Sequence, residues 1–398
     1  NEGAGWVQLK GGLPTIQIRD MDIHRDENDL VLGTFGRGFY VLDDYTPLRQ
    51  ITEQALEQEA ILFPVRDAQR YIEKTSRIGS RGHDFYTADN PPFGATFTYY
   101  LKDGFKSLTD QRIEVEKEAM EGDEEVVIPS FDELRAEDEE LDPKMVFTIR
   151  DSAGNVVRRI DGTPEKGIHR VTWDLRYPSA KPTDISGAKP SRWGMPAIGP
   201  LVVPGTYAVS MAKKIDGVMT EVAGPVNFEV VNLALAALPG APPAEALAFE
   251  QQVAELQRAV GGAVKVTKEI DDRLAHLRQA ILDTPDADPD HLATARAFQT
   301  ELDDIEIALV GDPTKSERNV FTPPSISDRV DRIVSGLWTT TQGPTTTQRD
   351  TYAWAGEAFT TELDRLGTLV AELEAFEAEL ETAGAPWTPG RLPTWKAD

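Results

Sequence analysis

Two short apolar runs flank a glycine-containing turn near the start of the chain. Residues 30–34 have the length of a strand, and residues 39–42 are rich in aromatic and β-branched side chains. Between them, Gly36 and Gly38 can adopt the positive φ angles that a tight reversal requires. The pattern predicts a β-hairpin. Because two strands alone are marginal in water, we expect neighbouring strands beside it.

Such neighbours are predicted at 6–9, which contains a tryptophan, and at 16–23, where apolar and polar residues alternate imperfectly. Three or four short antiparallel strands joined by glycine turns are typical of one blade of a β-propeller. Only a short segment precedes these strands, so we expect that the chain begins inside a fold.

Residues 85–235 repeat the pattern of short strands. Strong β formers occupy 95–101, and a polar turn at 151–155 joins two apolar runs. Further strands are predicted at 169–175, 206–211 and 226–231. Short strands separated by Gly and Pro favour an immunoglobulin-like β-sandwich, with Trp173 in its core.

The last part of the chain has helical periodicity. From Phe249 to Ile281 apolar residues recur every three or four positions, on one or two helices, with a kink expected at Gly261-Gly262. Further helices are predicted from Asp288-Pro289 to Gly311, over 327–338 and from Pro344 to about Gly384. Such helices with short loops form an antiparallel bundle. The tail at 387–395, which contains two tryptophans, is expected to dock.

The patterns together predict a mixed multidomain chain. Its 398 residues and 40% hydrophobic content suffice for two or three domains with their own cores. The expected parts are a terminal propeller blade at 1–50, a connector at 51–84, an immunoglobulin-like sandwich at 85–235 with an acidic insertion at 106–144, and a helical bundle with its docking tail at 243–398.

The formal net charge of −26 argues against binding to nucleic acid or to anionic membranes, because both favour a basic surface. No apolar run approaches the roughly 18 residues of a membrane span, and no secretory signal is visible. The chain contains no cysteine, which excludes disulfides and thiolate chemistry. Such a composition suits the cytosol and equally suits exported bacterial proteins.

The charge is concentrated in the insertion. Residues 106–144 contain 15 Asp and Glu but only five Lys and Arg. Their net charge of −10 is more than a third of the total of −26. This run predicts a solvated and partly disordered insertion, and the alternative is a surface for a cation or a basic partner. The spacing of calcium ligands found in EF-hands is missing.

Several motifs resemble one protein family. The chain contains W-x-x-L-x-x-G-L-P from Trp6, N-D-L-V-L-G-T-F-G-R-G-F-Y-V-L-D-D from Asn28 and T-P-L-R-Q from Thr46. These resemble the last repeat of bacterial sortilin-like β-propellers with BNR-type repeats, often labelled glycosyl hydrolases, although Phe35 replaces the usual histidine. The resemblance continues at 62–64, 90–95, 169–177, 204–207 and 325–329.

The resemblance implies an exported bacterial protein, extracellular or periplasmic, in which this segment is a non-catalytic C-terminal scaffold that binds proteins or glycans. Its partners would be the remaining propeller blades, from a missing N-terminal part or from another chain. The alternative is that these domains are accessory to a sialidase-like glycoside hydrolase whose active site lies in those other blades.

Candidate catalytic residues follow from this alternative. Glycosidases use two carboxylates, and Asp43 and Asp44 end the last strand of the predicted blade, where they equally suit a turn cap. Arg37, on the glycine turn, can contact an anion or simply face solvent. His24 lies among aspartates, a setting for a catalytic or metal-binding group or for a polar loop.

Other chemistry has little support in the sequence. The chain lacks a nucleophile elbow, a P-loop, a dinucleotide-binding motif and an Asp-box, and its five histidines never adopt zinc-site spacing, so no metal or cofactor is expected. His169, inside a strand, is expected to be structural. Exposed aromatic rings can stack on sugars or proteins, and the candidates are Phe85, Tyr86, Tyr177 and Trp193, the last in a long Pro/Gly loop at 179–204.

Overall fold

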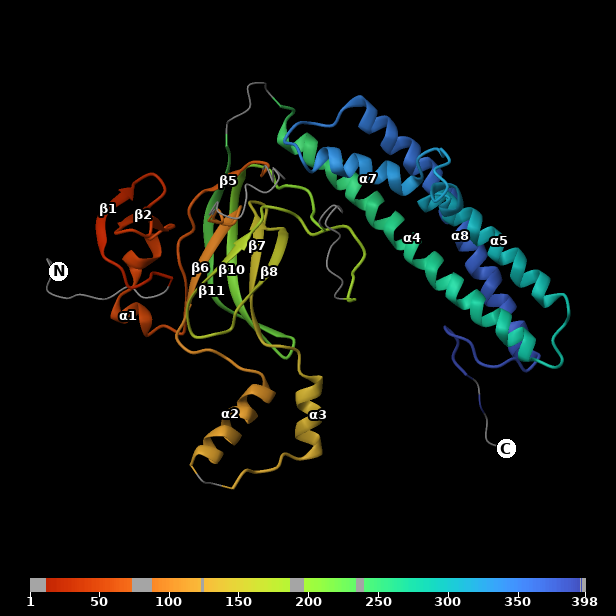
Figure 1. The fold of residues 1–398 in the computed structure, drawn as a ribbon, viewed down its shortest axis with the longest axis horizontal. Coiled ribbons are helices and arrows are strands. Elements are labelled where there is room, and N and C mark those ends of the chain that lie inside the picture. Colours follow the sequence, from red (N-terminus) through yellow and green to blue (C-terminus); the bar gives the residue numbers. More distant parts are fainter. Residues whose placement is uncertain are drawn as a thin grey trace. The chain divides into compact units, whose positions relative to one another are not determined.

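The computed structural model describes residues 12–73, 88–122, 125–186, 197–233, 240–393 and 395. The chain forms two compact units, the first made of Asn1–Leu175 and Pro204–Leu233, the second of Arg176–Val203 and Ala234–Asp398. The first unit contains the β-sheets and the second contains the long helices, so the fold is mixed (Figure 1).

The first unit begins with a three-stranded antiparallel sheet in the order β1-β2-β3. Its strands are β1 (Ile18–His24), β2 (Asp29–Thr34) and β3 (Phe39–Leu42). The predicted hairpin is confirmed, because β2 pairs antiparallel with β3, and Gly36 and Gly38 in its turn have φ angles of 83° and 72°. A 3-10 helix at Thr46–Gln50 and the short helix α1 (Glu53–Leu56) follow the sheet. The strand expected at 6–9 lies outside the described residues.

Two further sheets follow in the same unit. The larger one contains, in spatial order, β5 (Ala68–Arg70), β11 (Val218–Asn232), β10 (Gly205–Ile215), β7 (Lys144–Asp151) and β8 (Val156–Gly162). The smaller one contains β4 (Ala60–Leu62), β6 (Ala95–Leu101) and β9 (Gly167–Trp173). All pairs are antiparallel except β5 with β11. The strands predicted in this part of the chain are confirmed, although β11 begins eight residues before the predicted start at Val226.

Aromatic side chains fill the space between these two sheets. Phe97 of β6 lies 6.0 Å from Phe147 of β7 and 5.6 Å from Phe228 of β11, measured between ring centroids. Trp173 of β9 lies 5.6 Å from Tyr207 of β10. Each of these pairs joins one sheet to the other, and edge-to-face or offset contacts add to the gain from burial. The sheets therefore share one core, in which Trp173 is fully buried as expected.

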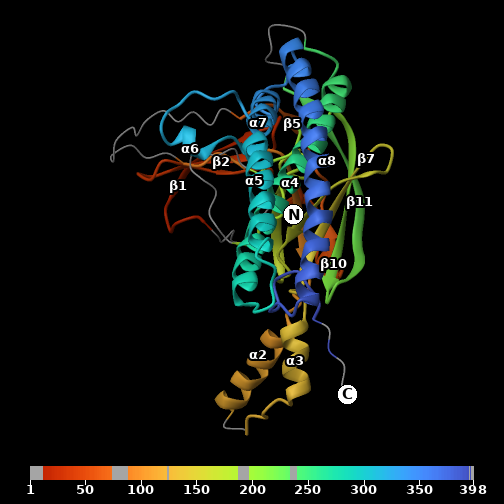
Figure 2. The ribbon, with the colours of Figure 1, turned by 90° about the vertical axis from the view of Figure 1, so that its right-hand side faces the viewer.

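The acidic insertion differs from its prediction. It forms two helices, α2 (Leu108–Glu121) and α3 (Phe131–Glu139), between strands β6 and β7. Both views show the pair extending away from the sheets of this unit (Figures 1 and 2). Neither helix has a buried residue, so the expectation of a solvated insertion holds while that of partial disorder is wrong for the described residues.

The second unit is helical. Its helices are α4 (Pro243–Asp283), α5 (His291–Val310), α6 (Pro313–Ser316), α7 (Ile326–Leu337) and α8 (Thr346–Thr382). The four longer ones pack around one apolar core, and α4, α5 and α8 run side by side (Figures 1 and 2). None of the described helices combines the length and the apolar character that crossing a membrane requires.

Two predicted details of the helices are wrong. Helix α4 continues through Gly261-Gly262, because packing along its whole apolar face outweighs the roughly 1 kcal/mol that each glycine costs. At Gly261 a Cβ would lie 2.9 Å from Pro182, so this glycine allows a close approach. Helix α5 begins at His291, after Asp290, and not at Asp288-Pro289.

The long loop and the tail both belong to the helical unit. Arg176 donates hydrogen bonds to the carbonyl oxygens of Gly199, at 2.9 Å, and Trp338, at 3.2 Å. The range 85–235 expected for the sandwich therefore includes a loop that packs with the helices. In the tail, Thr388 is buried and Arg391 forms an ion pair with Glu381. The tail docks through these residues, while its tryptophans are 60% and 85% exposed.

Candidate binding surfaces

The three-stranded sheet exposes apolar side chains on both faces. The strand register places Met21, Leu32 and Tyr40 side by side on one face. On that face Met21 is 66% exposed, and on the other face Phe39 and Val41 are 80% and 52% exposed. Leu32 is the one hydrophobic residue of these strands that is buried. Apolar side chains are thus exposed on both sides of this sheet, which makes it a candidate interaction surface.

The candidate catalytic residues do not meet at one point. His24, Asp43 and Asp44 lie at one end of the sheet, and Arg37 lies on the turn at the other end, about 17 Å away along the six residues of β2. Asp44 has a φ of 41°, and its carboxylate accepts a hydrogen bond from the Thr46 amide at 3.1 Å. It therefore caps a turn. His24 and Arg37 are exposed.

The aromatic candidates give no platform among the described residues. Tyr177 is half-buried in the loop of the helical unit, where its amide donates to the carbonyl oxygen of Pro200 at 2.9 Å. Phe85, Tyr86 and Trp193 lie outside the described residues. The proposed stacking role of these four residues therefore remains a prediction.

Local capping explains why the acidic insertion is helical. The Ser107 hydroxyl accepts a hydrogen bond from the Asp110 amide at 3.0 Å and starts α2. Ser130 and Glu133 form a reciprocal capping box that starts α3. The backbone N–H and the hydroxyl of Ser130 both donate to the Glu133 carboxylate, and they hold its pKa below the ordinary value. These caps satisfy amides that the first helical turns leave unpaired.

An ion-pair cluster joins the two helices. The Arg112 guanidinium on α2 donates to both carboxylate oxygens of Glu137 on α3, at 2.7 and 2.9 Å, and to Glu116 at 2.7 Å. The Thr109 hydroxyl adds a bond to Glu137 at 3.1 Å. These bonds, above all those from Arg112, lower the pKa of Glu137. A bidentate contact orients both partners, so Arg112 sets how α2 and α3 lie against each other.

Beside this cluster lies an apolar groove, which we call the hairpin groove. It has a volume of about 630 Å³. Its apolar lining consists of Leu108, Val115, Ala119, Val127, Pro129 and Ala136. Val115 and Val127 are 65% and 83% exposed, so nothing among the described residues covers them. The groove thus brings exposed apolar side chains of α2 together with those of the segment before α3.

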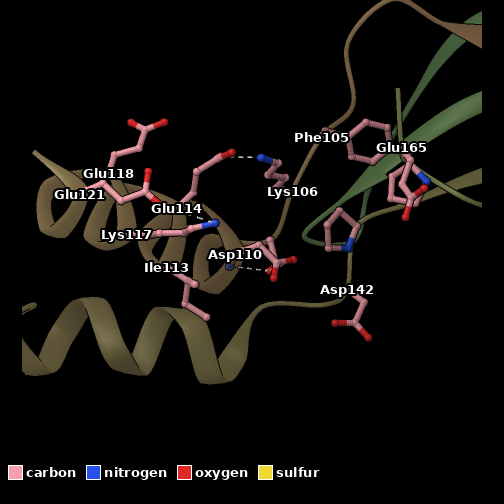
Figure 3. A pocket seen from close by; sticks show the side chains of 13 residues that line it. Phe105, Lys106, Asp110, Ile113, Glu114, Lys117, Glu118, Glu121, Asp142 and Glu165 are labelled. Carbon is pink, nitrogen blue, oxygen red and sulfur yellow. Dashed lines mark hydrogen bonds and ion pairs between the residues drawn. The ribbon is translucent and has the colours of Figure 1, made fainter. Parts of the chain in front are cut away.

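A second hollow, of about 740 Å³, lies where α2 meets the sheets. Its carboxylates are spread along α2 and the adjoining segments instead of converging on one point (Figure 3). They belong to Asp110, Glu114, Glu118, Glu121, Asp142 and Glu165. Lys106 pairs with Glu114, and Lys117 lies 3.9 Å from Glu121. In the part of the chain that the structure describes, no group of acidic or histidine side chains is arranged to hold a metal ion.

Comparison with models of known protein families finds no match, and no curated protein matches the chain. The resemblance to sortilin-like propellers therefore stays a prediction. The hairpin groove had not been predicted. Two features of the sequence point to it. Leu108, Val115 and Ala119 share one helical face within a run of charged residues, and Ser130-x-x-Glu133 is the pattern of a capping box.

Proposed function

We propose that this chain is a non-catalytic scaffold and binding region whose three-stranded sheet is the closing blade of a β-propeller. The observation that supports this proposal is the exposure of Met21 on one face of the sheet and of Phe39 and Val41 on the other. A propeller blade lies between two neighbours, which cover both of its faces. An antiparallel sheet at the surface of a folded domain commonly turns one polar face to water.

On this proposal the partners of the sheet are other propeller blades, from another part of the polypeptide or from another chain. The two packed sheets then form an immunoglobulin-like sandwich, a reading supported by their antiparallel hairpins and by the buried Trp173. The sandwich and the helical unit brace the propeller and offer surfaces to proteins or glycans. We further propose, on the family resemblance alone, that such a protein is extracellular or periplasmic.

Hydrogen–deuterium exchange on this chain alone tests whether the sheet needs neighbours. We expect the amides of β1–β3 to exchange roughly 100-fold faster than those of β7 and β10, because three strands with one buried hydrophobic residue are marginally stable. Strands β7 and β10 serve as the internal control, since the large core protects them. Equal protection in the two regions would mean that the sheet is stable without partners, and the blade proposal would then fail.

The alternative is that the chain contributes to a glycoside hydrolase. It is favoured by the position of His24, Asp43 and Asp44 at the same end of the sheet, where residues of other blades could join them. This arrangement alone lacks a second carboxylate across a bound sugar.

Assays on a panel of fluorogenic glycosides, including a sialoside, distinguish the two functions. We expect this chain to give no turnover above buffer, because Asp44 caps a turn and the candidate residues do not surround a substrate. Asp43→Asn and Asp44→Asn would then change nothing. Turnover that either substitution removes, but that Asp103→Asn at an exposed site leaves intact, would contradict the non-catalytic proposal.

A further inference from the structure

The hairpin groove combines an apolar floor with an acidic rim. The side chains of Glu116, Glu125, Glu133 and Glu137 line it together with a single cation, Arg112. Arg112 is occupied by its bonds to Glu116 and Glu137, so it does not offer a free positive charge to a ligand. The rim therefore presents a net negative potential around apolar side chains. This combination is complementary to a ligand that is apolar on one side and positively charged beside it.

The dimensions of the groove favour a helix. Its floor follows α2 from Leu108 to Ala119, which is three helical turns, or about 16 Å. Helix α3 and the segment containing Val127 and Pro129 form the other side of the same floor. A segment of three to four turns lies along a groove of this length with its side chains at i, i+3, i+4 and i+7 on the floor.

We propose that the hairpin groove binds an amphipathic helix of a partner protein, with leucine-type residues on its apolar stripe and Lys or Arg beside them. The apolar floor supplies affinity through the burial of Val115 and Val127, which are 65% and 83% exposed in this chain. The acidic rim supplies orientation and speeds association, because the partner's cations approach a surface of opposite sign.

The negative charge of the insertion argues against other classes of ligand. Nucleic acid and anionic lipid would be repelled, because the insertion carries 15 acidic residues against five basic ones. An apolar partner without charge would cover a rim of four carboxylates that a single guanidinium does not neutralise, and desolvating this excess negative charge is costly. Basic residues beside the apolar stripe solve this problem by pairing with the rim.

The proposal is tested with a fluorescent peptide of about 14 residues that places Leu at i, i+3, i+4 and i+7 and Lys at the other positions. The full chain is titrated into it, and binding is followed by fluorescence anisotropy at about 0.05 and 0.15 M salt. Two further peptides complete the set: one has the same composition in an order that breaks the apolar stripe, and the other has Glu in place of Lys.

Chain variants locate the site. Val115→Ser combined with Val127→Ser alters the floor at exposed positions, so the fold is retained, which circular dichroism checks. Val218→Ser is the matched control, because Val218 is 68% exposed on a different hairpin of the same unit. Hydrogen–deuterium exchange with and without the peptide shows independently whether the amides of α2 and α3 become protected.

We expect the striped basic peptide to bind about tenfold more tightly than the peptide with the broken stripe, and the acidic peptide not to bind. The floor variant should weaken binding about tenfold, whereas Val218→Ser should change it less than about twofold. Exchange should slow in α2 and α3. Equal affinity of the two valine variants would overturn the proposal, because binding would then reflect the overall charge of the chain. Absence of binding would overturn it too.

Neutral phosphatidylcholine vesicles are a separate outcome of the same experiment. Binding to these vesicles that the floor variant removes, without binding of the peptide, would assign the groove to a lipid surface and overturn the proposal. The hairpin groove and the three-stranded sheet are different surfaces. A failure of the blade proposal in the exchange experiment on β1–β3 therefore leaves this one standing, and the reverse also holds.

Discussion

Gly94→Ala is expected to lower the free energy of unfolding of the sheet unit by about 4 kcal/mol, the scale of severe backbone clashes. Gly94 directly precedes β6 and has a φ of 126°. A Cβ at this position would lie 1.9 Å from the carbonyl oxygen of Trp173, on the paired strand β9. Backbone cannot move aside as a flexible side chain can, so the added methyl group must push β6 and β9 apart.

The matched control is Gly154→Ala, on the turn between β7 and β8. Gly154 also has a positive φ, 85°, but no atom would lie within 4 Å of its Cβ. That substitution should cost only the conformational penalty, about 1 kcal/mol. Urea unfolding, followed by exchange of the β6 and β9 amides, measures both variants. If the two substitutions cost the same, the close approach to Trp173 has no energetic importance.

Glu377→Ala is expected to destabilise the helical unit by about 3–5 kcal/mol, because it leaves a largely buried cation without its carboxylate partner. Glu377 lies on α8 and is 4% exposed. Its two carboxylate oxygens accept hydrogen bonds from Arg273 of α4, at 3.1 and 2.7 Å. Only 19% of the Arg273 side chain is exposed, and Gly390 of the tail lies against it, so water does not readily replace the carboxylate.

Two further variants define this effect. Glu255→Ala breaks the pair with Arg258, whose side chains are 68% and 69% exposed, and should cost less than about 1 kcal/mol. The double variant Arg273→Met with Glu377→Leu removes both charges and should recover most of the loss. Urea unfolding followed by circular dichroism at the helical band measures all three. If Glu377→Ala and Glu255→Ala lower the free energy of unfolding equally, burial does not strengthen the contribution of the Arg273–Glu377 pair to stability.

Much of the secondary structure could be predicted because its causes are local. The hairpin of β2 and β3 follows from two apolar runs and from glycines that accept positive φ. Helix α7 starts where Ser325 and Asp328 form a capping box. Such signals involve residues within four positions of one another, so a linear pattern contains them. In the insertion at 106–144 the high net charge predicts partial disorder, whereas the local caps at Ser107 and Ser130 start helices.

The candidate site was less predictable. Asp43 and Asp44 were recognised as the end of a strand, and Asp44 does cap a turn. The hairpin groove escaped prediction because it exists only when Arg112 holds Glu137, 25 positions later in the chain, beside α2. No periodicity within either helix indicates that pairing.

Local patterning in the chain determines which residues form strands and helices and where most of them end, because hydrogen bonding and capping act over a few residues. Contacts between distant residues determine the rest. They carry α4 without a break through Gly261-Gly262, place the described parts of the loop, 176–186 and 197–203, with the helices, and join α2 to α3 around an apolar groove. Each of these outcomes depends on side chains that meet only after folding, and its energy therefore has no counterpart in the linear pattern.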